Sequence, residues 1–178
     1  SERYLAHHDI AIMPNGNILA IAWEEKSSEE ADQAGRKADM TPIAGLWPDV
    51  ILELKPQGKD GAEIVWEWHI WDHLIQDFDA TKSNFGEVDK HPELIDINLD
   101  NDGSGDPDWM HSNAIDYDPI NDMIVLSVPH FDEVYIIDHT TTTEEATSSA
   151  GGFSKRGGDL MYRWGNPMNY RNGTIDDQ

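Results

Sequence analysis

The sequence predicts an all-β protein made of about two four-stranded blades of a β-propeller, with long loop insertions. The first observation is an internal repeat, because β-rich segments occur in one order over about residues 7–70 and again over about 111–166. The second is hairpin turn chemistry in both units, Pro14-Asn15-Gly16-Asn17 and Asp118-Pro119-Ile120-Asn121-Asp122, since Asn-Gly and Asn-Asp accept the left-handed backbone of tight turns. Such a repeat indicates units that pack on one another.

Each unit supplies four expected strands, which form one antiparallel blade. They cover residues 10–13, 18–23, 49–54 and 63–68 in the first unit, and 114–117, 123–128, 133–138 and 159–164 in the second. A blade cannot cover its own faces, so about four to eight blades pack around an axis. Two blades are too few to close a ring, and the remaining ones are expected from a larger protein or another copy of the chain. The alternative is an eight-stranded two-sheet sandwich, which needs no repeat.

Residues 1–178 are predicted to be part of a single propeller domain, and the segments outside the strands are connections within it. Residues 24–48 and 140–158 are rich in charged, small or hydroxyl side chains and indicate surface loops. Residues 71–110 form an inter-blade insertion, in which near-helical spacing of apolar side chains suggests a short helix or turn; these are Trp71, Leu74, Ile75 and Phe78. Residues 167–178 are expected to lead into the next blade.

Composition restricts the partners and the chemistry. The chain has 35 acidic and 12 basic side chains, a formal net charge of −23 and a pI near 4.3, which argues against binding to nucleic acid or anionic lipid. The sequence contains no run of about 18 apolar residues, so membrane insertion is not expected. Cysteine is absent, which excludes disulfides, thiolate metal sites and a cysteine nucleophile. The first residues contain neither an initiator Met nor a signal-peptide core, which suggests a fragment.

Two histidines are the first candidates for chemistry. His7 and His111 begin equivalent strands, and each is followed two positions later by a polar side chain, Asp9 or Asn113. The innermost strand of each blade lines the propeller channel, so both imidazoles should face one axial site. Imidazole there can act as nucleophile, proton carrier or anion clamp, because it titrates near physiological pH. The alternative is a pair of hydrogen bonds that only joins the blades.

These residues stand in long stretches that resemble the bacterial arylsulfotransferase (aryl-sulfate sulfotransferase, ASST) family, which uses aryl sulfates and no nucleotide donor. The matching stretches cover most of the chain and read HHDIAIMPNGNILAIAWEEK, WHIWDHLIQDFDATKSNFG, HPELIDIN, DWMHSNAIDYDPINDMIVLSVPHFDEVYIIDH and GDLMYRWGNPMNYRNGT. The resemblance implies a six-bladed, secreted or periplasmic propeller that acts in its central channel without a cofactor.

The resemblance also implies a mechanism and its site residues. A histidine attacks the sulfuryl group of a phenolic sulfate ester, a phenol leaves, and the sulfohistidine passes the group to an acceptor phenol. His7 and His111 match the two supporting catalytic histidines, which stabilise sulfuryl oxygens and deliver a proton to the leaving phenolate. Asn113 matches a substrate-binding residue, and Asp9 is its counterpart after His7.

Two departures from the family leave other functions open. Pro129 stands where the family has an arginine that clamps the sulfuryl group, and proline carries no charge. His130 is the neighbouring substrate-binding candidate, although strand alternation would turn its side chain to the opposite side. The family's nucleophilic histidine belongs to the blade after residues 163–167, beyond residue 178. A non-catalytic extracellular propeller, serving as a binding or structural module, is therefore the alternative, and a hydrolase of sulfate or phosphate esters is a third hypothesis.

Metal binding is the weaker hypothesis at two places. His69 and His73 are four residues apart, as ligands on a helix face would be, but no third ligand is evident and packing is favoured. Asn98-x-Asp100-x-Asp102-Gly103 resembles the beginning of a calcium loop, yet Trp109 stands at the twelfth position, where glutamate is required. We therefore predict no metal, with calcium in a less regular loop as the alternative to a solvated acidic loop.

The tryptophans are divided between core and site. Trp66, Trp68 and Trp164 lie on expected outer strands with the spacing of inter-blade packing, so they are predicted to be core residues. An aromatic wall for a phenolic substrate is the alternative, and it suits Trp71 or Trp109 better, because these two fall in connections near the channel.

Overall fold

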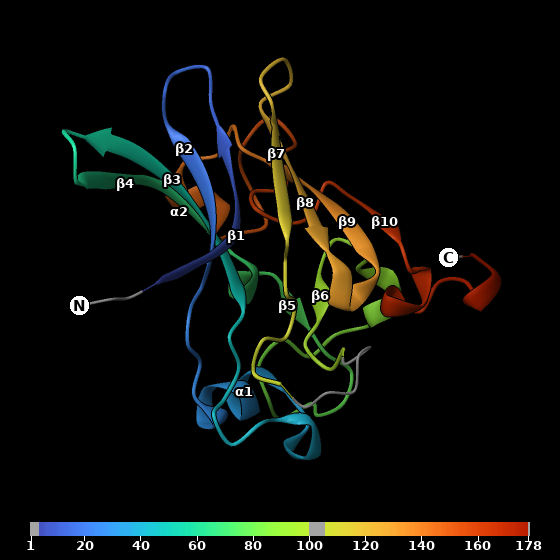
Figure 1. Ribbon diagram of the computed structural model, residues 1–178. Coiled ribbons are helices and arrows are strands. Elements are labelled where there is room, and N and C mark those ends of the chain that lie inside the picture. Colours follow the sequence, from blue (N-terminus) through green and yellow to red (C-terminus); the bar gives the residue numbers. More distant parts are fainter. Residues whose placement is uncertain (1–3, 100–105, 178) are drawn as a thin grey trace.

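The computed structural model, which describes residues 4–99 and 106–177, is mostly β (Figure 1). It contains two four-stranded sheets, both antiparallel, and a two-stranded parallel sheet. The helices are few and short. The prediction of an all-β protein is therefore confirmed.

The first sheet has the order β1-β2-β3-β4. Its strands are β1 (Leu5–Ile12), β2 (Ile18–Trp23), β3 (Asp49–Gln57) and β4 (Gly61–His69). The tight turn after β1 closes as predicted, because the Met13 amide donates to the Asn17 carbonyl at 2.9 Å and Gly16 has a φ of 86°. β2 is buried along most of its length, as a central strand with apolar neighbours on both faces should be.

The second sheet repeats this connectivity with the order β10-β9-β8-β7. Its strands are β7 (Ala114–Asp118), β8 (Met123–Val128), β9 (Glu133–Asp138) and β10 (Tyr162–Gly165). Burial alternates along β8, which follows from its period-two pattern of apolar side chains. β10 begins later than predicted, because the amide of Leu160 donates to the Glu93 carbonyl at 3.0 Å and not to the sheet.

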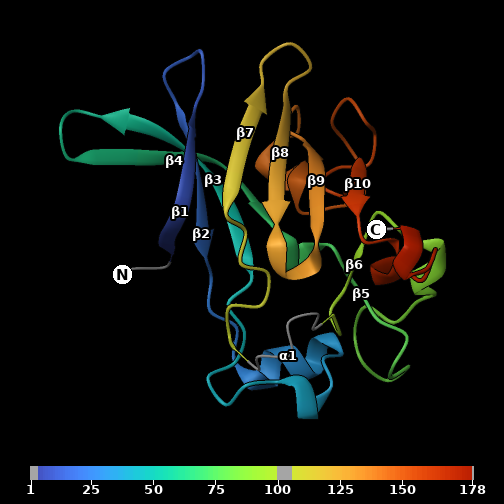
Figure 2. The same ribbon diagram turned by 45° about the vertical axis from the view of Figure 1, so that its right-hand side comes forward.

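The first strands of the two sheets, β1 and β7, lie side by side (Figures 1 and 2). One apolar core joins the sheets and includes Ile21, Ile51, Ile124 and Tyr135. Trp66 and Trp68 belong to this core as predicted. The prediction for Trp164 is wrong: it is 70% exposed, because successive side chains of β10 alternate between its two faces and the buried neighbour Arg163 takes the inward position.

The insertions are packed rather than free loops, so the surface-loop prediction is only partly correct. Residues 24–48 contain α1 (Ser28–Ala34) and a 3-10 helix (Ala38–Met40), and Ala31, Ala34 and Leu46 are buried. Residues 140–158 contain α2 (Thr143–Ala146), and the Trp68 indole donates to the Gly158 carbonyl at 2.7 Å. Both helices begin with a capping box, from Ser27 and Thr142 respectively.

The insertion between the sheets contains less helix than its spacing predicts. Only a 3-10 turn (Ile70–Asp72) precedes β5 (Leu74–Ile75), which pairs in parallel with β6 (Ile95–Asp96). The remaining 3-10 helices are Val88–Lys90, Pro129–Phe131, Pro167–Tyr170 and Ile175–Asp177. Within the described ranges, no helix has the length and apolarity that crossing a membrane requires.

Candidate functional site

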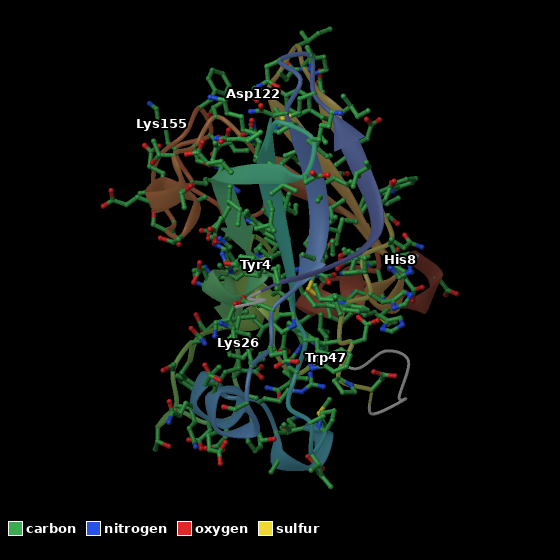
Figure 3. The ribbon with its side chains drawn as sticks, turned by 60° about the vertical axis from the view of Figure 1, so that its left-hand side comes forward. Tyr4, His8, Lys26, Trp47, Asp122 and Lys155 are labelled. Carbon is green, nitrogen blue, oxygen red and sulfur yellow. The ribbon has the colours of Figure 1, made fainter. Side chains whose placement is uncertain are left out.

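Four histidines from both repeats lie in one row beside the beginnings of β1 and β7. The ring centroids of His7 and His8 are 5.1 Å apart, and those of His8 and His111 are 4.5 Å apart. His130 stacks on His111 with a centroid distance of 4.8 Å and an interplanar angle of 13°. The structure thus brings together three predicted site residues and adds His8, which is labelled in Figure 3.

The backbone explains why His8 belongs to the row. Its φ is 54°, and the φ of His111 is 55°, so both residues occupy the left-handed region that few non-glycine residues adopt. The ladder between β1 and β2 shifts register between Ala6 and Ile10, which includes this position. By backbone conformation, the counterpart of His111 is therefore His8. The sequence predicts His7 as the counterpart of His111, but the side chain of His7 is only 6% exposed.

Two carboxylates bind ring nitrogens of two of these histidines. Asp49 contacts His7 Nε2 through Oδ1 at 3.1 Å and accepts the backbone amide of Ser112 through Oδ2 at 2.8 Å. Asp108 binds His111 Nδ1 through Oδ2 and accepts the indole of Trp23 through Oδ1 at 3.0 Å. Each carboxylate thus connects residues of both repeats, and each fixes the orientation of one imidazole.

His130 reaches the site because the strand does not continue through it. β8 ends at Val128, and Pro129–Phe131 forms a 3-10 helix whose first position suits a proline. Strand alternation therefore does not apply, and the prediction that it turns His130 away is wrong. Pro129 itself is exposed and offers no charge.

The other two predicted substrate ligands differ in their surroundings. Asp9 accepts the amides of Ile10 at 2.9 Å and Ile115 at 3.1 Å, so both its oxygens bind backbone, and one of these bonds joins β1 to β7. Asn113 is exposed beside the row, and its backbone amide donates to the Ser127 carbonyl at 3.1 Å. Asn113 is thus the more accessible of the two.

Three arginines are engaged away from the histidines. Arg36 donates to the carbonyls of Ile97 and Leu99. Arg163 forms a buried ion pair with Glu133, and Arg171 pairs with Asp77 and Asp96. None of these three guanidinium groups replaces the one that Pro129 omits.

An aromatic cavity of about 430 Å³ lies next to the histidine row. Trp23 lines it and stacks on His7 with a centroid distance of 4.0 Å, so this indole belongs to both places. Tyr4 and Trp47 supply further aromatic lining, and Figure 3 shows them on the same side of the molecule as Lys26. Trp109, an expected wall residue, is instead buried in the core. Trp71 lies outside this cavity's lining and packs against the core, with the Lys26 ammonium 5.2 Å from its ring centroid.

Charged groups border this cavity. Lys26 pairs with Glu24 at 2.8 Å, and Glu24 also binds His69 at 3.1 Å. Burial alone would raise the pKa of Glu24, but the hydrogen bonds from His69 and Lys26 outweigh it and lower that pKa. Glu24 is therefore a carboxylate at neutral pH.

The two histidines considered as metal ligands point to different partners. His69 lies between Glu24 and Glu67, whereas the buried His73 contacts Asp159 at 2.7 Å and the Ala146 carbonyl at 2.8 Å. No group of three or more metal-ligating side chains occurs among residues 4–99 and 106–177. Most of the calcium-loop pattern, residues 100–105, lies outside the described residues.

Comparison with known proteins identifies the family. The sequence profile described as Arylsulfotransferase (ASST) matches residues 1–161 of the 178-residue chain. The chain belongs to the arylsulfotransferase family. No curated protein matches it closely enough to compare residue by residue.

Sequence reasoning missed four residues of this arylsulfotransferase-family site: His8, Asp49, Asp108 and Trp23. His8 had a signal, because it is adjacent to His7 and precedes Asp9. Asp49 binds Ser112, which is 63 residues away in the sequence, and Asp108 binds His111, which is 3 residues away. Only the fold brings Asp49 to Ser112, so no local pattern reveals this contact.

Proposed function

We propose that the two sheets are neighbouring blades of a propeller, covering about residues 7–70 and 111–166, with residues 71–110 as the insertion between them. Their identical connectivity, their shared core and the contact of β1 with β7 support this arrangement. Residues 167–178 would lead into the next blade. Further blades, from a larger protein or another copy of the chain, would close the six-bladed ring that the family resemblance implies.

The proposed reaction is transfer of a sulfuryl group from a phenolic sulfate ester to a phenol through a sulfohistidine. The observation that carries it is the row of imidazoles in which Asp108 holds His111 by Nδ1. That bond leaves Nε2 of His111 to bind a sulfuryl oxygen or to give a proton to the leaving phenolate. The attacking histidine would come from an adjoining blade.

The aromatic cavity supports a phenolic substrate. A phenol ring contacts indole faces favourably, and Trp23 connects the cavity to the histidine row. Asn113 and His130 are the proposed ligands of the sulfuryl oxygens. Asp9 is assigned to the joint between β1 and β7, since both of its oxygens already bind backbone.

No cofactor is part of this proposal, because imidazole nucleophiles need none for sulfuryl transfer. The resemblance further supports a secreted or periplasmic location. A second function, a non-catalytic binding or structural module, is favoured by one observation: Pro129 leaves the sulfuryl group without the expected guanidinium, and Arg36, Arg163 and Arg171 are engaged elsewhere.

The experiment is transfer from 4-nitrophenyl sulfate to phenol, measured by nitrophenolate absorbance, with protein expressed from the complete gene. His111→Gln should lower the acceptor-dependent rate by about 10²–10⁴-fold. His91→Gln is the matched control, because His91 is exposed and its side chain pairs with the nearby Glu93, away from the histidine row. No release from the folded wild type would favour the binding module, and acceptor-independent release would favour a hydrolase.

A further inference from the structure

We propose that Asp49, His7 and His8 form a proton relay in which His8 exchanges a proton with the phenolic oxygen. This inference rests on the proposed sulfuryl transfer and names a catalytic residue within it. His7 and Asp49 would then be positioning residues, one step removed from the substrate.

The relay begins at a buried carboxylate. The Asp49 side chain is fully buried, and its Oδ2 is occupied by the Ser112 amide at 2.8 Å. Its Oδ1 lies 3.1 Å from His7 Nε2. An ionised carboxylate only accepts hydrogen bonds, so Nε2 of His7 carries the proton of this contact.

The middle of the relay is a contact between two like atoms. Nδ1 of His7 lies 2.8 Å from Nδ1 of His8, which is a hydrogen-bond distance. Two imidazole nitrogens at this distance share one proton, because two bare or two protonated nitrogens would repel each other. With its Nε2 proton bound to Asp49, a neutral His7 offers a bare Nδ1, and the shared proton belongs to His8.

The free end of the relay is accessible. His8 is exposed, whereas His7 is packed against the indole of Trp23 and against Asp49. The contact with His7 uses Nδ1 of His8, so Nε2 of His8 is the ring nitrogen that can meet the substrate. The ring of His8 meets that of His111 edge to face at 4.5 Å, so both residues can serve one bound sulfate ester.

The proton balance is simple in each half of the reaction. As the nucleophile takes the sulfuryl group, the sulfur–oxygen bond to the aryl group breaks and the leaving oxygen keeps the electron pair. Doubly protonated His8 gives its Nε2 proton to that oxygen and becomes neutral, still donating from Nδ1 to His7. When the acceptor phenol attacks sulfohistidine, Nε2 of His8 takes the phenolic proton and the relay is restored.

The charges around His8 come from every neighbouring element. His7 and Asp49 lie behind it, His111 with its partner Asp108 lies beside it, and Asp9 follows it in the chain. His130 is the next ring beyond His111.

The test uses leaving groups of different basicity, because a proton donor matters most when the leaving phenolate is basic. In this two-step transfer, kcat/KM for the donor reports only the half-reaction in which the phenol leaves. We therefore expect His8→Gln to lower kcat/KM for phenyl sulfate by about 10²–10⁴-fold, and kcat/KM for 4-nitrophenyl sulfate by much less. Asp49→Asn should give a smaller loss of the same pattern with an altered pH profile, and Asp49→Glu should recover part of it. His91→Gln should leave kcat/KM unchanged for both substrates. An equal loss for both substrates in His8→Gln would overturn the relay.

A second measurement separates this proposal from the proposed function. Nitrogen NMR of the wild-type histidines reports which ring nitrogen carries a proton, with assignments from His7→Gln and His8→Gln. The relay predicts neutral His7 protonated at Nε2 and His8 protonated at Nδ1. Protons on Nε2 of both neutral rings would refute the relay even in an active protein, whereas the predicted pattern without any sulfuryl transfer would refute only the proposed function.

Discussion

Replacing Arg163 by methionine should destabilise the protein by about 3–5 kcal/mol, which is the cost of leaving a buried charge without its partner. Arg163 donates to Glu133 through Nε at 2.8 Å and through Nη2 at 2.5 Å. The two side chains are only 4% and 0% exposed. The guanidinium also donates to the Leu94 carbonyl at 3.0 Å, so the substitution further loosens the insertion.

The size of this effect comes mainly from the orphaned carboxylate, and a second substitution tests that reason. Arg163→Met combined with Glu133→Gln removes the negative charge but keeps an acceptor for the Tyr135 hydroxyl, which donates to Glu133 at 2.9 Å. The double variant should therefore recover most of the loss. Arg156→Met, at an exposed arginine, should change stability by less than about 0.5 kcal/mol.

Urea unfolding followed by tryptophan fluorescence measures these differences in the protein expressed from the complete gene. A loss below about 1 kcal/mol for Arg163→Met would contradict the burial of this pair. A double variant no more stable than the single one would instead place the cost in lost packing of the Arg163 stem.

The remaining predictions concern pH, the aromatic residues and assembly. Burial alone would lower the pKa of His69, but hydrogen bonds to Glu24 and Glu67 raise it, so its stabilising charge is complete below the ordinary pKa of about 6.5 and lost as pH rises through the folded value. His69→Gln should accordingly lower the urea midpoint more at about pH 5.5 than at about pH 9; an equal loss at both would contradict this sign. Burial and the hydrogen bond to Asp122 raise the pKa of Tyr117 to about 12, so the ultraviolet pH titration of Tyr117→Phe should lack one phenol transition near pH 12 that the wild type shows. Trp47→Leu should raise the KM for the phenol acceptor more than it changes kcat, and an unchanged KM would remove the cavity from the substrate site. The 178-residue chain alone should associate through its open sheet edges, and a cooperatively folded monomer in sedimentation would contradict that expectation.

The sequence predicted the strands best where short, mainly apolar runs stand between clear turns. The bounds of β2, β8 and β9 agree with the predicted residues, because Gly16, Asp122 and Asp132 interrupt the pattern with a left-handed backbone where the chain turns. The insertion at residues 71–110 was predicted less well. Leu74 and Ile75 are buried in a parallel pair with a segment about 20 residues away, whereas Phe78 is exposed, so the near-helical spacing does not mark one face of a helix.

The site was only partly predictable for a related reason. His7, His111 and His130 could be found from the repeat and the resemblance, and the structure places all three in one row. The pairing of His8 with His111 depends on a left-handed backbone at both residues, which no periodic pattern encodes. In the sequence, Asp49 is likewise an ordinary strand residue. Only the fold places it, at the beginning of β3, within hydrogen-bond distance of Ser112 in the second repeat.

The central claim is that this arylsulfotransferase-family protein moves a sulfuryl group through a histidine, and the direct test is to find that histidine. The protein expressed from the complete gene is mixed with 4-nitrophenyl sulfate without acceptor, quenched in base, and analysed by peptide mass spectrometry. Transfer through a sulfohistidine predicts one histidine-containing peptide heavier by one SO₃ group, which disappears when phenol is added before the quench. Nitrophenolate release without any such peptide would contradict the covalent route.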